Sequence, residues 1–496
     1  MRRVRRVSSG GLGHDRGTLG RCGPWADASR SSGVAWCEVK RLRRPRLTPP
    51  RIVLLGFLGA IAVGTVLLAL PISHAPGVRL GWLDALFTAT SAVCVTGLIV
   101  VDTGSDLSRF GQVVVLLLIK AGGLGILSVG ALIAFTTGRR LGVVARLGLQ
   151  VQTSRLQLGG VVRFVRNLLV FTTGAELLGA LALWPAMARE AGRAEGAWLA
   201  LFHAVSAWNN AGFSLFSDSL MRFAADPWVV VVVPLLFVAG GLGLVVFVDV
   251  VSAARAGWSR RGAPGAGRAR VPWTLHTRMA LVATGTLVLV GAAGIAVLEW
   301  SNPATLGALD PYARPLAAAF QGLTPRTAGF HVLDPADLTP AAQVLTMALM
   351  FIGGNPSSTA GGVKTTTVAV LLVAAWAAVH GRGGPVAFGR GISGALLARA
   401  AAVVTLALAV VTLAIIALAI SEAGVPLSVL AFEAFSAFGT VGLSLGVTSE
   451  LTVAGQLVVV GLMLLGRVGL LTVGLALAAA TPERPLRYPN EDVIIG

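Results

Sequence analysis

Four short segments that end in glycine could coordinate a cation through their backbone carbonyl groups. They read SAVCVTGL (91–98), SAWNNAGF (206–213), GLTPRTAGF (322–330) and SAFGTVGL (436–443). Their glycines, Gly97, Gly212, Gly329 and Gly442, are separated by 115, 117 and 113 residues. Repetition at a fixed period indicates architecture, and carbonyl oxygens with little side-chain bulk beside them can replace the water around a potassium ion. The pattern therefore predicts one cation site built from four copies of the same segment.

We call these stretches glycine segments 1 to 4. Main-chain oxygens, supplemented by hydroxyl or amide side chains, are the candidate ligands. The predicted ion-binding residues are Val95, Thr96, Gly97, Asn209, Asn210, Ala211, Gly212, Thr327, Ala328, Gly329, Thr440, Val441 and Gly442. Glycine is expected last because only glycine enters left-handed backbone conformations without steric cost. Four copies in register, each behind an amphipathic half-helix, favour this interpretation over four unrelated turn glycines.

A serine stands six positions before the glycine in three of the four copies. These serines are Ser91, Ser206 and Ser436, and Leu323 takes the place in segment 3.

A second pattern, FIGGNPSSTAGGVKTTT (351–367), interrupts an apolar run after segment 3. Its glycines, proline and small hydroxyl residues do not favour a continuous helix. We expect the only clearly broken span here. Its irregular middle is expected to lie beneath the glycine segments, which would form the ion filter, and to act as a gate; a packed kink is the alternative. The predicted gate residues are Gly353, Gly354, Asn355, Pro356, Ser357, Ser358, Thr359, Ala360, Gly361, Gly362, Lys364 and Arg467.

The elements that position these residues must cross a membrane. The 496 residues are 55% hydrophobic and 12% charged, a composition that a water-soluble domain of this size does not show. Several apolar runs reach the roughly 20 residues that span a bilayer. Non-helical backbone at membrane depth is tolerated only where protein covers it or it lines a water-filled path. The sequence therefore predicts an all-α polytopic membrane protein with eight transmembrane helices and four re-entrant loops around a central ion pore.

The repeats divide the chain into six parts. They are a basic, disordered N-terminus (1–50), pore repeat 1 (51–138), pore repeat 2 (139–256), pore repeat 3 with the broken second helix (257–380), pore repeat 4 (381–482) and a C-terminal tail (483–496). Each repeat is expected to contain a helix, a half-length helix, an extended glycine segment and a second helix.

Charge indicates the orientation. The linkers between repeats are rich in arginine, which places them and both termini in the cytoplasm. The glycine segments then face the exterior, where Asp102, Asp218 and Asp334 follow their glycines by five, six and five residues. Carboxylates around a low-dielectric mouth concentrate cations, although ordinary solvated loops are the alternative for any single acid.

Charges inside the spans need partners, since an ionised side chain at the bilayer centre costs about 2.5–3.5 kcal/mol on insertion scales. Arg467 can bond to carbonyls of the broken helix or form a positive barrier below the filter. Lys364 can instead reach the cytoplasmic face. Lys120 and Glu176 could pair across repeats, and the sequence does not decide this. Glu433 is expected to orient segment 4 rather than bind an ion.

These motifs resemble the TrkH/KtrB family of bacterial potassium transporters, within the Trk/Ktr/HKT superfamily. The resemblance rests on TATSAVCVTGL (88–98), HAVSAWNNAGF (203–213), RTAGF (326–330), GGNPSSTAGGVKTTT (353–367), FEAFSAFGTVGLS (432–444), GRVG (466–469) and YPNEDVIIG (488–496). It covers residue 50 to the C-terminus. Eight spans without an extra N-terminal pair make the chain look closer to the KtrB branch.

The resemblance implies a channel-like potassium uptake subunit in the bacterial inner membrane. It also implies a homodimer with one pore per protomer and a cytoplasmic ring of nucleotide-binding RCK proteins of KtrA or TrkA type. The region matching Gly353 to Lys364 would form, with Arg467, the barrier below the filter. Potassium is the expected transported ion, sodium a candidate coupling or activating ion, and neither a cofactor nor a nucleic acid is expected. Two features depart from the family pattern: Lys120 stands where a neutral glutamine is expected, and residues 1–50 have no counterpart.

Two other transport functions compete with this interpretation. A secondary cation permease usually has two discontinuous helices in related halves, whereas one clearly broken span is expected here. The ion-conducting subunit of a potassium-pumping ATPase would need its ATP chemistry in another chain, because no phosphorylation motif or Walker loop occurs. An enzyme is not expected, since the six histidines, including His203 and His331, show no metal-ligand spacing.

Overall fold

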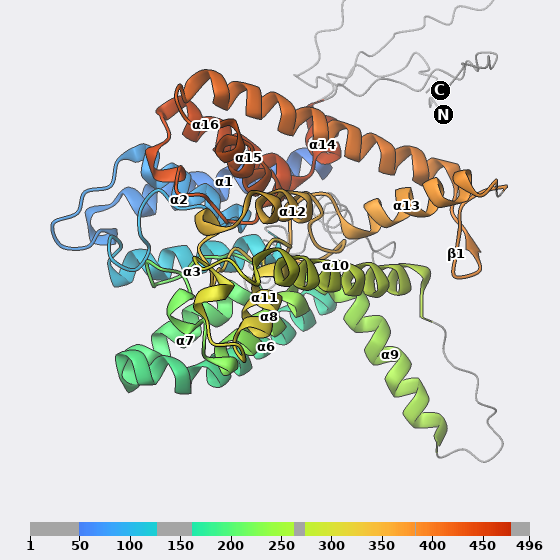
Figure 1. The fold of residues 1–496 in the computed structure, drawn as a ribbon, viewed down its shortest axis with the longest axis horizontal. Coiled ribbons are helices and arrows are strands. Elements are labelled where there is room, and N and C mark those ends of the chain that lie inside the picture. The colour runs from blue at the N-terminus through green and yellow to red at the C-terminus, as the bar shows by residue number, and fades with distance from the viewer. Residues whose placement is uncertain (1–48, 126–160, 262–272, 382, 478–496) are drawn as a thin grey trace, which may run out of the picture. The chain divides into compact units, whose positions relative to one another are not determined.

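The computed structural model describes residues 49–125, 161–261, 273–381 and 383–477, all within one compact unit, Thr48–Gly496. Regular structure in these residues is almost entirely α-helical (Figure 1). The exceptions are a small antiparallel hairpin, β1 (Val386–Ala387) with β2 (Arg390–Gly391), and 3₁₀ turns at Pro71–Ser73, Met221–Phe223, Leu306–Ala308, Pro335–Asp337 and Thr448–Glu450. The predicted helical class is confirmed.

Four long apolar helices open the four repeats. They are α1 (Pro49–Ala69), α6 (Val161–Ala191), α10 (Leu275–Glu299) and α14 (Gly394–Ser421). Among the described residues these four are long and apolar enough to cross a membrane, and a fifth span results if α8 and α9, described below, are counted together. The total of eight spans therefore stays a prediction.

A short helix and a non-helical glycine segment follow each long helix. The short helices are α2 (Trp82–Cys94), α7 (Arg193–Trp208), α11 (Arg314–Leu323) and α15 (Leu427–Gly439). They contain 10 to 16 residues, too few to span a bilayer. Their last turns are buried, so protein covers the backbone where each helix ends.

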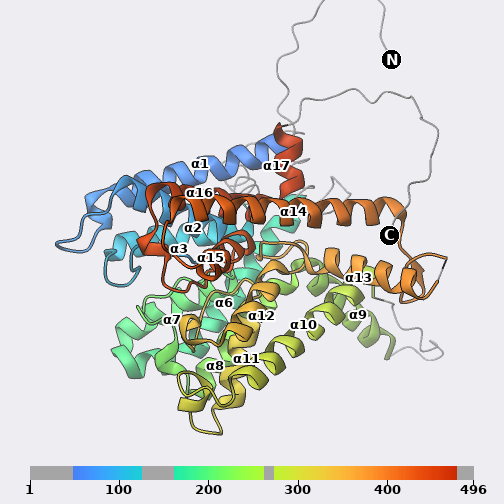
Figure 2. The same ribbon diagram turned by 45° about the horizontal axis from the view of Figure 1, so that its top comes forward.

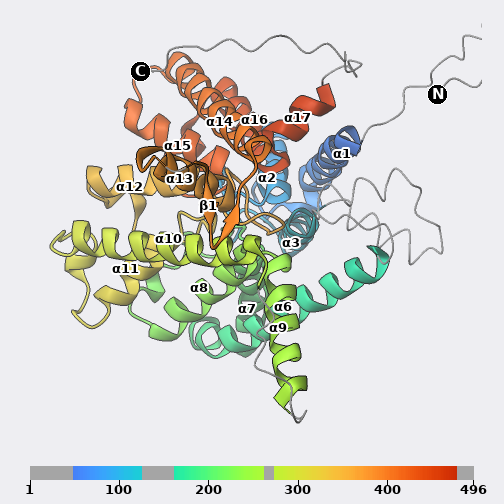
Figure 3. The same ribbon diagram turned by 90° about the vertical axis from the view of Figure 1, so that its right-hand side faces the viewer.

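The helices that follow the glycine segments are interrupted in more than one repeat. The pieces are α3 (Arg109–Leu124), α8 (Pro227–Leu242) with α9 (Leu244–Arg261), α12 (Pro340–Phe351) with α13 (Thr365–Val379), and α16 (Val453–Val468) with α17 (Leu470–Leu477). The bend between α8 and α9 is 93°, and both Figure 1 and Figure 3 show α9 diverging from α8. The expectation of a single clearly broken span was wrong.

Glycine explains the additional breaks and the end of α3. Gly125 at the end of α3, Gly243 between α8 and α9, and Gly469 between α16 and α17 have φ values of 79°, 83° and 88°. These angles lie in the left-handed region, which ends a right-handed helix and which glycine enters at little cost. Each of them closely follows another glycine in an apolar run, and glycines in such a run look in sequence like close-packing residues, which concealed the breaks.

The repeats are arranged in a ring in chain order. Each helix after a glycine segment packs against the short helix of the next repeat: α3 against α7, α8 against α11, α12 against α15, and α16 against α2. The last contact closes the circle. Apolar packing reinforces it, because one buried cluster joins mainly repeats 1 and 4 and another joins repeats 2 and 3.

The first and last described helices also meet. Helix α17 lies beside α1 (Figure 2), and the Arg51 Nε donates to the Ala476 carbonyl at 2.7 Å. Several predicted features lie outside the described residues: the basic arm apart from its last two positions, the second helix of repeat 1 beyond Gly125, and the tail at 483–496. The repeat boundaries themselves stay predictions.

Candidate functional site

The four glycine segments meet at one place. A Cβ added to Gly97 would overlap the Ala211 carbonyl oxygen, and one added to Gly329 would overlap that of Val441. The other two pairs of neighbouring segments approach each other as closely. A Cβ on Gly212 would lie 2.8 Å from the Gly329 Cα, and one on Gly442 would lie 3.0 Å from the Gly97 Cα. Segments 1 to 4 therefore form a closed ring in which each glycine touches the next segment.

The backbone of each segment has the same unusual form. The four glycines have φ values of 92°, 70°, 78° and 98° in chain order. Two residues earlier, Val95, Asn210, Thr327 and Thr440 also have positive φ, at 57°, 58°, 70° and 51°. Three of these four are β-branched, and such residues in the left-handed region cost about 1–3 kcal/mol each. Strain of this kind persists only where the surroundings impose it, so the repeated form is built into the ring.

The serine six positions before the glycine has a structural role in two copies. The Gly97 N–H donates to the Ser91 Oγ at 3.1 Å, and the Gly442 N–H donates to the Ser436 Oγ at 3.1 Å. The N–H group of each of these two glycines is thereby bonded to the short helix that precedes it. In segment 3, where Leu323 stands in this position, the Thr324 hydroxyl donates instead to the Phe330 carbonyl.

A cavity of about 270 Å³ opens on one side of the ring, lined by all four glycines. Asp102 and Asp334 also line it. Their carboxylates accept backbone N–H groups, from Gly104 at 2.7 Å and Ala336 at 2.9 Å. Both acids therefore shape their loops as well as supplying negative charge.

The third acid of the predicted set is engaged elsewhere. Asp218 does not line the cavity but accepts the Arg222 guanidinium at 2.8 Å. This hydrogen bond raises the pKa of Arg222. His331 lines the same cavity, and burial lowers the pKa of its imidazole against the opposing effect of the Asp334 and Asp218 carboxylates.

The predicted broken helix forms a closed loop beside the ring. Its base is joined by the Gly353 N–H, which donates to Val363 O at 2.9 Å, and by the Thr365 N–H, which donates to Gly354 O at 3.0 Å. We call residues 353–364 the 353–364 loop. It lies against segment 4, because a Cβ on Gly361 would overlap the Thr440 side chain. The predicted position next to the glycine ring is therefore observed.

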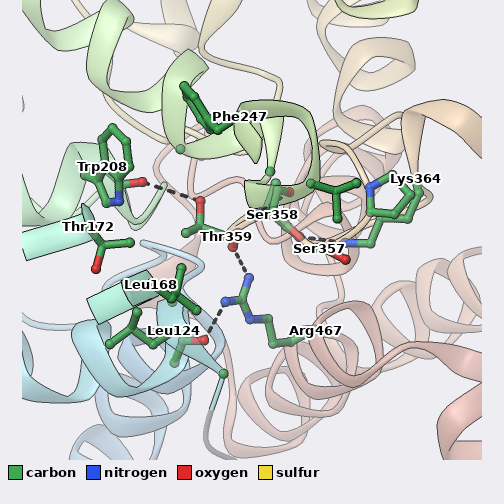
Figure 4. A pocket seen from close by; sticks show the side chains of 18 of the residues that line it. Leu124, Leu168, Thr172, Trp208, Phe247, Ser357, Ser358, Thr359, Lys364 and Arg467 are labelled. Atoms are coloured by element: carbon green, nitrogen blue, oxygen red, sulfur yellow. Dashed lines mark hydrogen bonds between the residues drawn. The ribbon is translucent and has the colours of Figure 1, made fainter. Parts of the chain in front are cut away.

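Arg467 of α16 joins this loop to α3 (Figure 4). Its Nη1 donates to the Thr359 carbonyl, and its Nη2 donates to the Gly122 carbonyl of α3 at 2.6 Å. The Thr359 hydroxyl lies 3.0 Å from the Asn210 Oδ1 of segment 2, to which it donates. One side chain of α16 thus holds the loop against α3, and the loop in turn contacts segment 2.

Lys364 does not extend away from the loop. Its Nζ donates to the Ala360 carbonyl at 2.7 Å, so the ammonium group closes the loop on itself. Together with Arg467 it lines a cavity of about 310 Å³ beside the loop (Figure 4). The Lys364 ammonium is therefore bonded within the loop, and the alternative that it reaches the cytoplasmic face stays a prediction.

Two further interior charges have partners. Lys120 of α3 pairs with Glu176 of α6, which resolves the question that the sequence left open. Glu433 is fully buried and accepts hydroxyl hydrogen bonds from Ser444 at 2.8 Å and Thr448 at 2.6 Å. Both hydroxyl residues follow segment 4, so Glu433 orients the chain as it leaves the ring.

One contact was not anticipated from the sequence. The Asn209 amide, expected among the ligands, donates to the Glu176 Oε1 at 2.8 Å and so points behind the ring. No sequence signal related these residues, which are 33 positions apart. Among the described residues, no group of three or more histidine, cysteine or acidic side chains could hold a metal ion.

Comparison with known proteins shows the family to which the chain belongs. A family model described as TrkH, cation transport protein, matches residues 60–486. The chain belongs to the TrkH family. The Ktr system potassium uptake protein B of Bacillus subtilis is 40% identical over 459 residues, covering 92% of this chain and 99% of that protein. The potassium/sodium uptake protein NtpJ of Enterococcus hirae is 37% identical over 464 residues, with coverage of 92% and 99%.

A solved TrkH-family structure shares the fold. The potassium transporter TrkH from Vibrio parahaemolyticus superposes with a TM-score of 0.67 at 18% sequence identity, covering 88% of this chain and 87% of that one. The fold is therefore that of a polytopic membrane transporter, as the sequence predicted.

Proposed function

We propose that this TrkH-family chain is the potassium-conducting subunit of a bacterial Ktr-type uptake system. The observation that carries the proposal is the closed ring of four glycine segments with one repeated backbone form. Relatives that share over a third of its sequence and nearly its whole length are named potassium uptake proteins. A ring of carbonyl oxygens is the arrangement that replaces the hydration shell of potassium.

The ligands in this proposal are the backbone oxygens of the thirteen predicted residues. The carbonyls of Thr96, Ala211 and Val441 support this choice, because a Cβ added to the neighbouring glycine of the ring would overlap each of them. The Asp102 and Asp334 carboxylates at the adjoining cavity attract cations to the entrance. The side chains of Asn209 and Asn210 support the ring, since both amides are engaged with neighbouring protein groups.

The 353–364 loop and Arg467 form the gate in this proposal. A guanidinium group on a cation path raises an electrostatic barrier, and its hydrogen bonds to Thr359 and Gly122 hold the loop in place. Opening then requires that these hydrogen bonds break. A cytoplasmic RCK protein would supply the free energy by favouring the open arrangement. The name of the Bacillus subtilis relative, protein B of a Ktr system, supports such a multi-component assembly.

The same proposal includes a homodimer in the bacterial inner membrane, with both termini cytoplasmic and one pore per protomer. Potassium is the transported ion. The name of the Enterococcus hirae relative includes sodium, which keeps sodium as a coupling, activating or second transported ion. The breaks at Gly243 and Gly469 favour a second candidate, a secondary cation permease, because interrupted helices in related repeats are typical of that class.

Rubidium uptake by potassium-uptake-deficient bacteria tests the proposal. Cells express this chain with and without an RCK partner, and uptake is measured across external sodium concentrations. We expect uptake that restores growth at low potassium, rises with the partner and follows the membrane potential. Uptake that requires a fixed sodium or proton stoichiometry would favour the permease. Sound expression without uptake under either condition would refute the assignment of the filter.

A further inference from the structure

Glu176 uses its two carboxylate oxygens for two different partners. One oxygen, Oε2, pairs with the Lys120 ammonium of α3, and the Thr172 hydroxyl lies 3.4 Å from the same ammonium. The other oxygen, Oε1, accepts the Asn209 amide at 2.8 Å. The Glu176 side chain is only 4% exposed. A pair that served only to join α3 and α6 would not need the second contact.

Asn209 is placed where its side chain fixes the start of segment 2. It is fully buried and directly follows α7, and the next residue, Asn210, already has the left-handed φ of 58°. Its amide also donates to the Val205 carbonyl at 2.9 Å. On its other side α3 approaches closely, since a Cβ on Gly123 would lie 2.7 Å from the Asn209 Cγ. Asn209 is therefore held between α3 and α6 as the chain turns into the ring.

The ion pair gives this contact its strength and direction. A hydrogen bond to an ionised acceptor is roughly twice as strong as one between neutral groups. A buried carboxylate stays ionised only with a partner, and Lys120 provides that charge from the opposite side. The Lys120 pair also leaves Oε1 free to accept from Asn209. Lys120, Glu176 and Asn209 thus form a connected chain of contacts that ends in segment 2.

We propose that Glu176 is a positioning residue that sets potassium over sodium discrimination, by holding Asn209 and hence segment 2 in its ion-binding form. Lys120 acts one step further away, by keeping Glu176 charged and oriented. This inference rests on the proposed potassium-conducting function. Carbonyl filters distinguish ions through small differences in the placement and field of their oxygens, so a fixed segment 2 affects discrimination more than folding.

Two double variants separate the amide contact from the ion pair. Lys120→Met with Glu176→Gln removes both charges but keeps a carbonyl acceptor for Asn209. Lys120→Met with Glu176→Met removes both charges and the acceptor. The readout is the ratio of sodium to potassium concentrations that halve rubidium uptake. Melting temperature and size-exclusion profile of the purified proteins report folding.

We expect the Met–Gln variant to lose only about threefold of the wild-type ratio, because the amide contact remains but is about half as strong without the charge. In the Met–Met variant this ratio falls about tenfold, which corresponds to the loss of a hydrogen bond worth about 1.4 kcal/mol. Equal ratios in the two variants, whether both wild-type or both impaired, would overturn the inference. An ion pair that only joined two helices predicts that equality.

A single variant keeps the test decisive if the Met–Met protein does not fold. Asn209→Leu removes the amide that donates to Glu176 and leaves the Lys120–Glu176 pair in place. We expect the same loss of discrimination, and a wild-type ratio in this variant would overturn the inference. If the wild-type protein itself shows no preference for potassium, the proposed function fails first, and the inference fails with it.

Discussion

Replacing Gly442 by serine tests the glycine ring most directly. Gly442 has a φ of 98°, and a Cβ there would overlap the Thr96 carbonyl oxygen and lie 3.0 Å from the Gly97 Cα. Ordinary carbon–carbon contacts are about 3.5–4.0 Å long. Segments 4 and 1 must therefore separate by about 0.5–1 Å, or the backbone at residue 442 must change its conformation.

A matched control distinguishes the cost of backbone strain at residue 442 from the cost of its contact with segment 1. A non-glycine residue at this φ carries about 1–3 kcal/mol of backbone strain. Gly424, in the turn between α14 and α15, also has a φ of 98°, but a Cβ there would have nothing within 4 Å. Gly424→Ser therefore adds similar backbone strain without moving a glycine segment. Any additional effect of Gly442→Ser comes from its contact with segment 1.

Competition between sodium and rubidium for uptake measures the outcome. If about 1.4 kcal/mol or more of the Gly442→Ser cost falls on the potassium-bound form, discrimination drops at least about tenfold. Gly424→Ser should keep the wild-type discrimination and show only a lower melting temperature. Unchanged discrimination in well-expressed Gly442→Ser protein would refute the assignment of segment 4 to the filter. Equal loss in both variants would show that backbone strain alone is responsible.

Three further changes test other parts of the site. Arg467→Ala should raise rubidium uptake without a regulator at least about tenfold, because charged hydrogen bonds of about 1.5–3 kcal/mol no longer hold Thr359; wild-type uptake at equal surface expression would contradict the gate. Glu433→Ala should lower the free energy of unfolding by about 1–3 kcal/mol and Glu433→Gln by less, because glutamine keeps an acceptor for the buried hydroxyls; equal melting curves for the two would contradict this. Burial opposes ionisation of Glu422, but hydrogen bonds from Thr452 outweigh it and lower the pKa of Glu422. The stabilisation by Glu422 is therefore present above its unfolded pKa of about 4.3 and is lost as pH falls through the lower folded value. The melting-temperature difference between wild type and Glu422→Gln should shrink over this pH range. A difference that grows as pH falls would contradict the predicted direction.

The ring could be predicted from the sequence because its signal is periodic and local. Glycine at a nearly fixed interval marks a position that excludes side chains, and all four glycines proved to touch a neighbouring segment. The broken helix after segment 3 was also predictable, because proline, glycine and hydroxyl residues accumulate within a short stretch. Both features depend on backbone chemistry that neighbouring residues in the chain specify.

The other helix breaks could not be read in the same way. Gly243 follows the Gly240–Gly241 pair and Gly469 follows Gly466, each inside an apolar run, and glycines in such a run are equally compatible with close helix packing. Their positive φ values depend on what surrounds them. Likewise, Asp102, Asp218 and Asp334 share a position after their glycines, yet only the first and third line the cavity. The difference arises because Arg222, four residues after Asp218, binds its carboxylate.

The sequence by itself determined the membrane class, the four glycine segments and the loop beneath them, since composition, period and backbone propensity require no knowledge of distant contacts. Only the tertiary structure decided the partners of the interior charges. Lys120, Glu176 and Asn209 come from three different helices or their ends, and Arg467 contacts carbonyls 108 and 345 positions away. Buried charges take whichever partners the packed helices bring to them, and that choice depends on the arrangement of the whole ring rather than on any one segment.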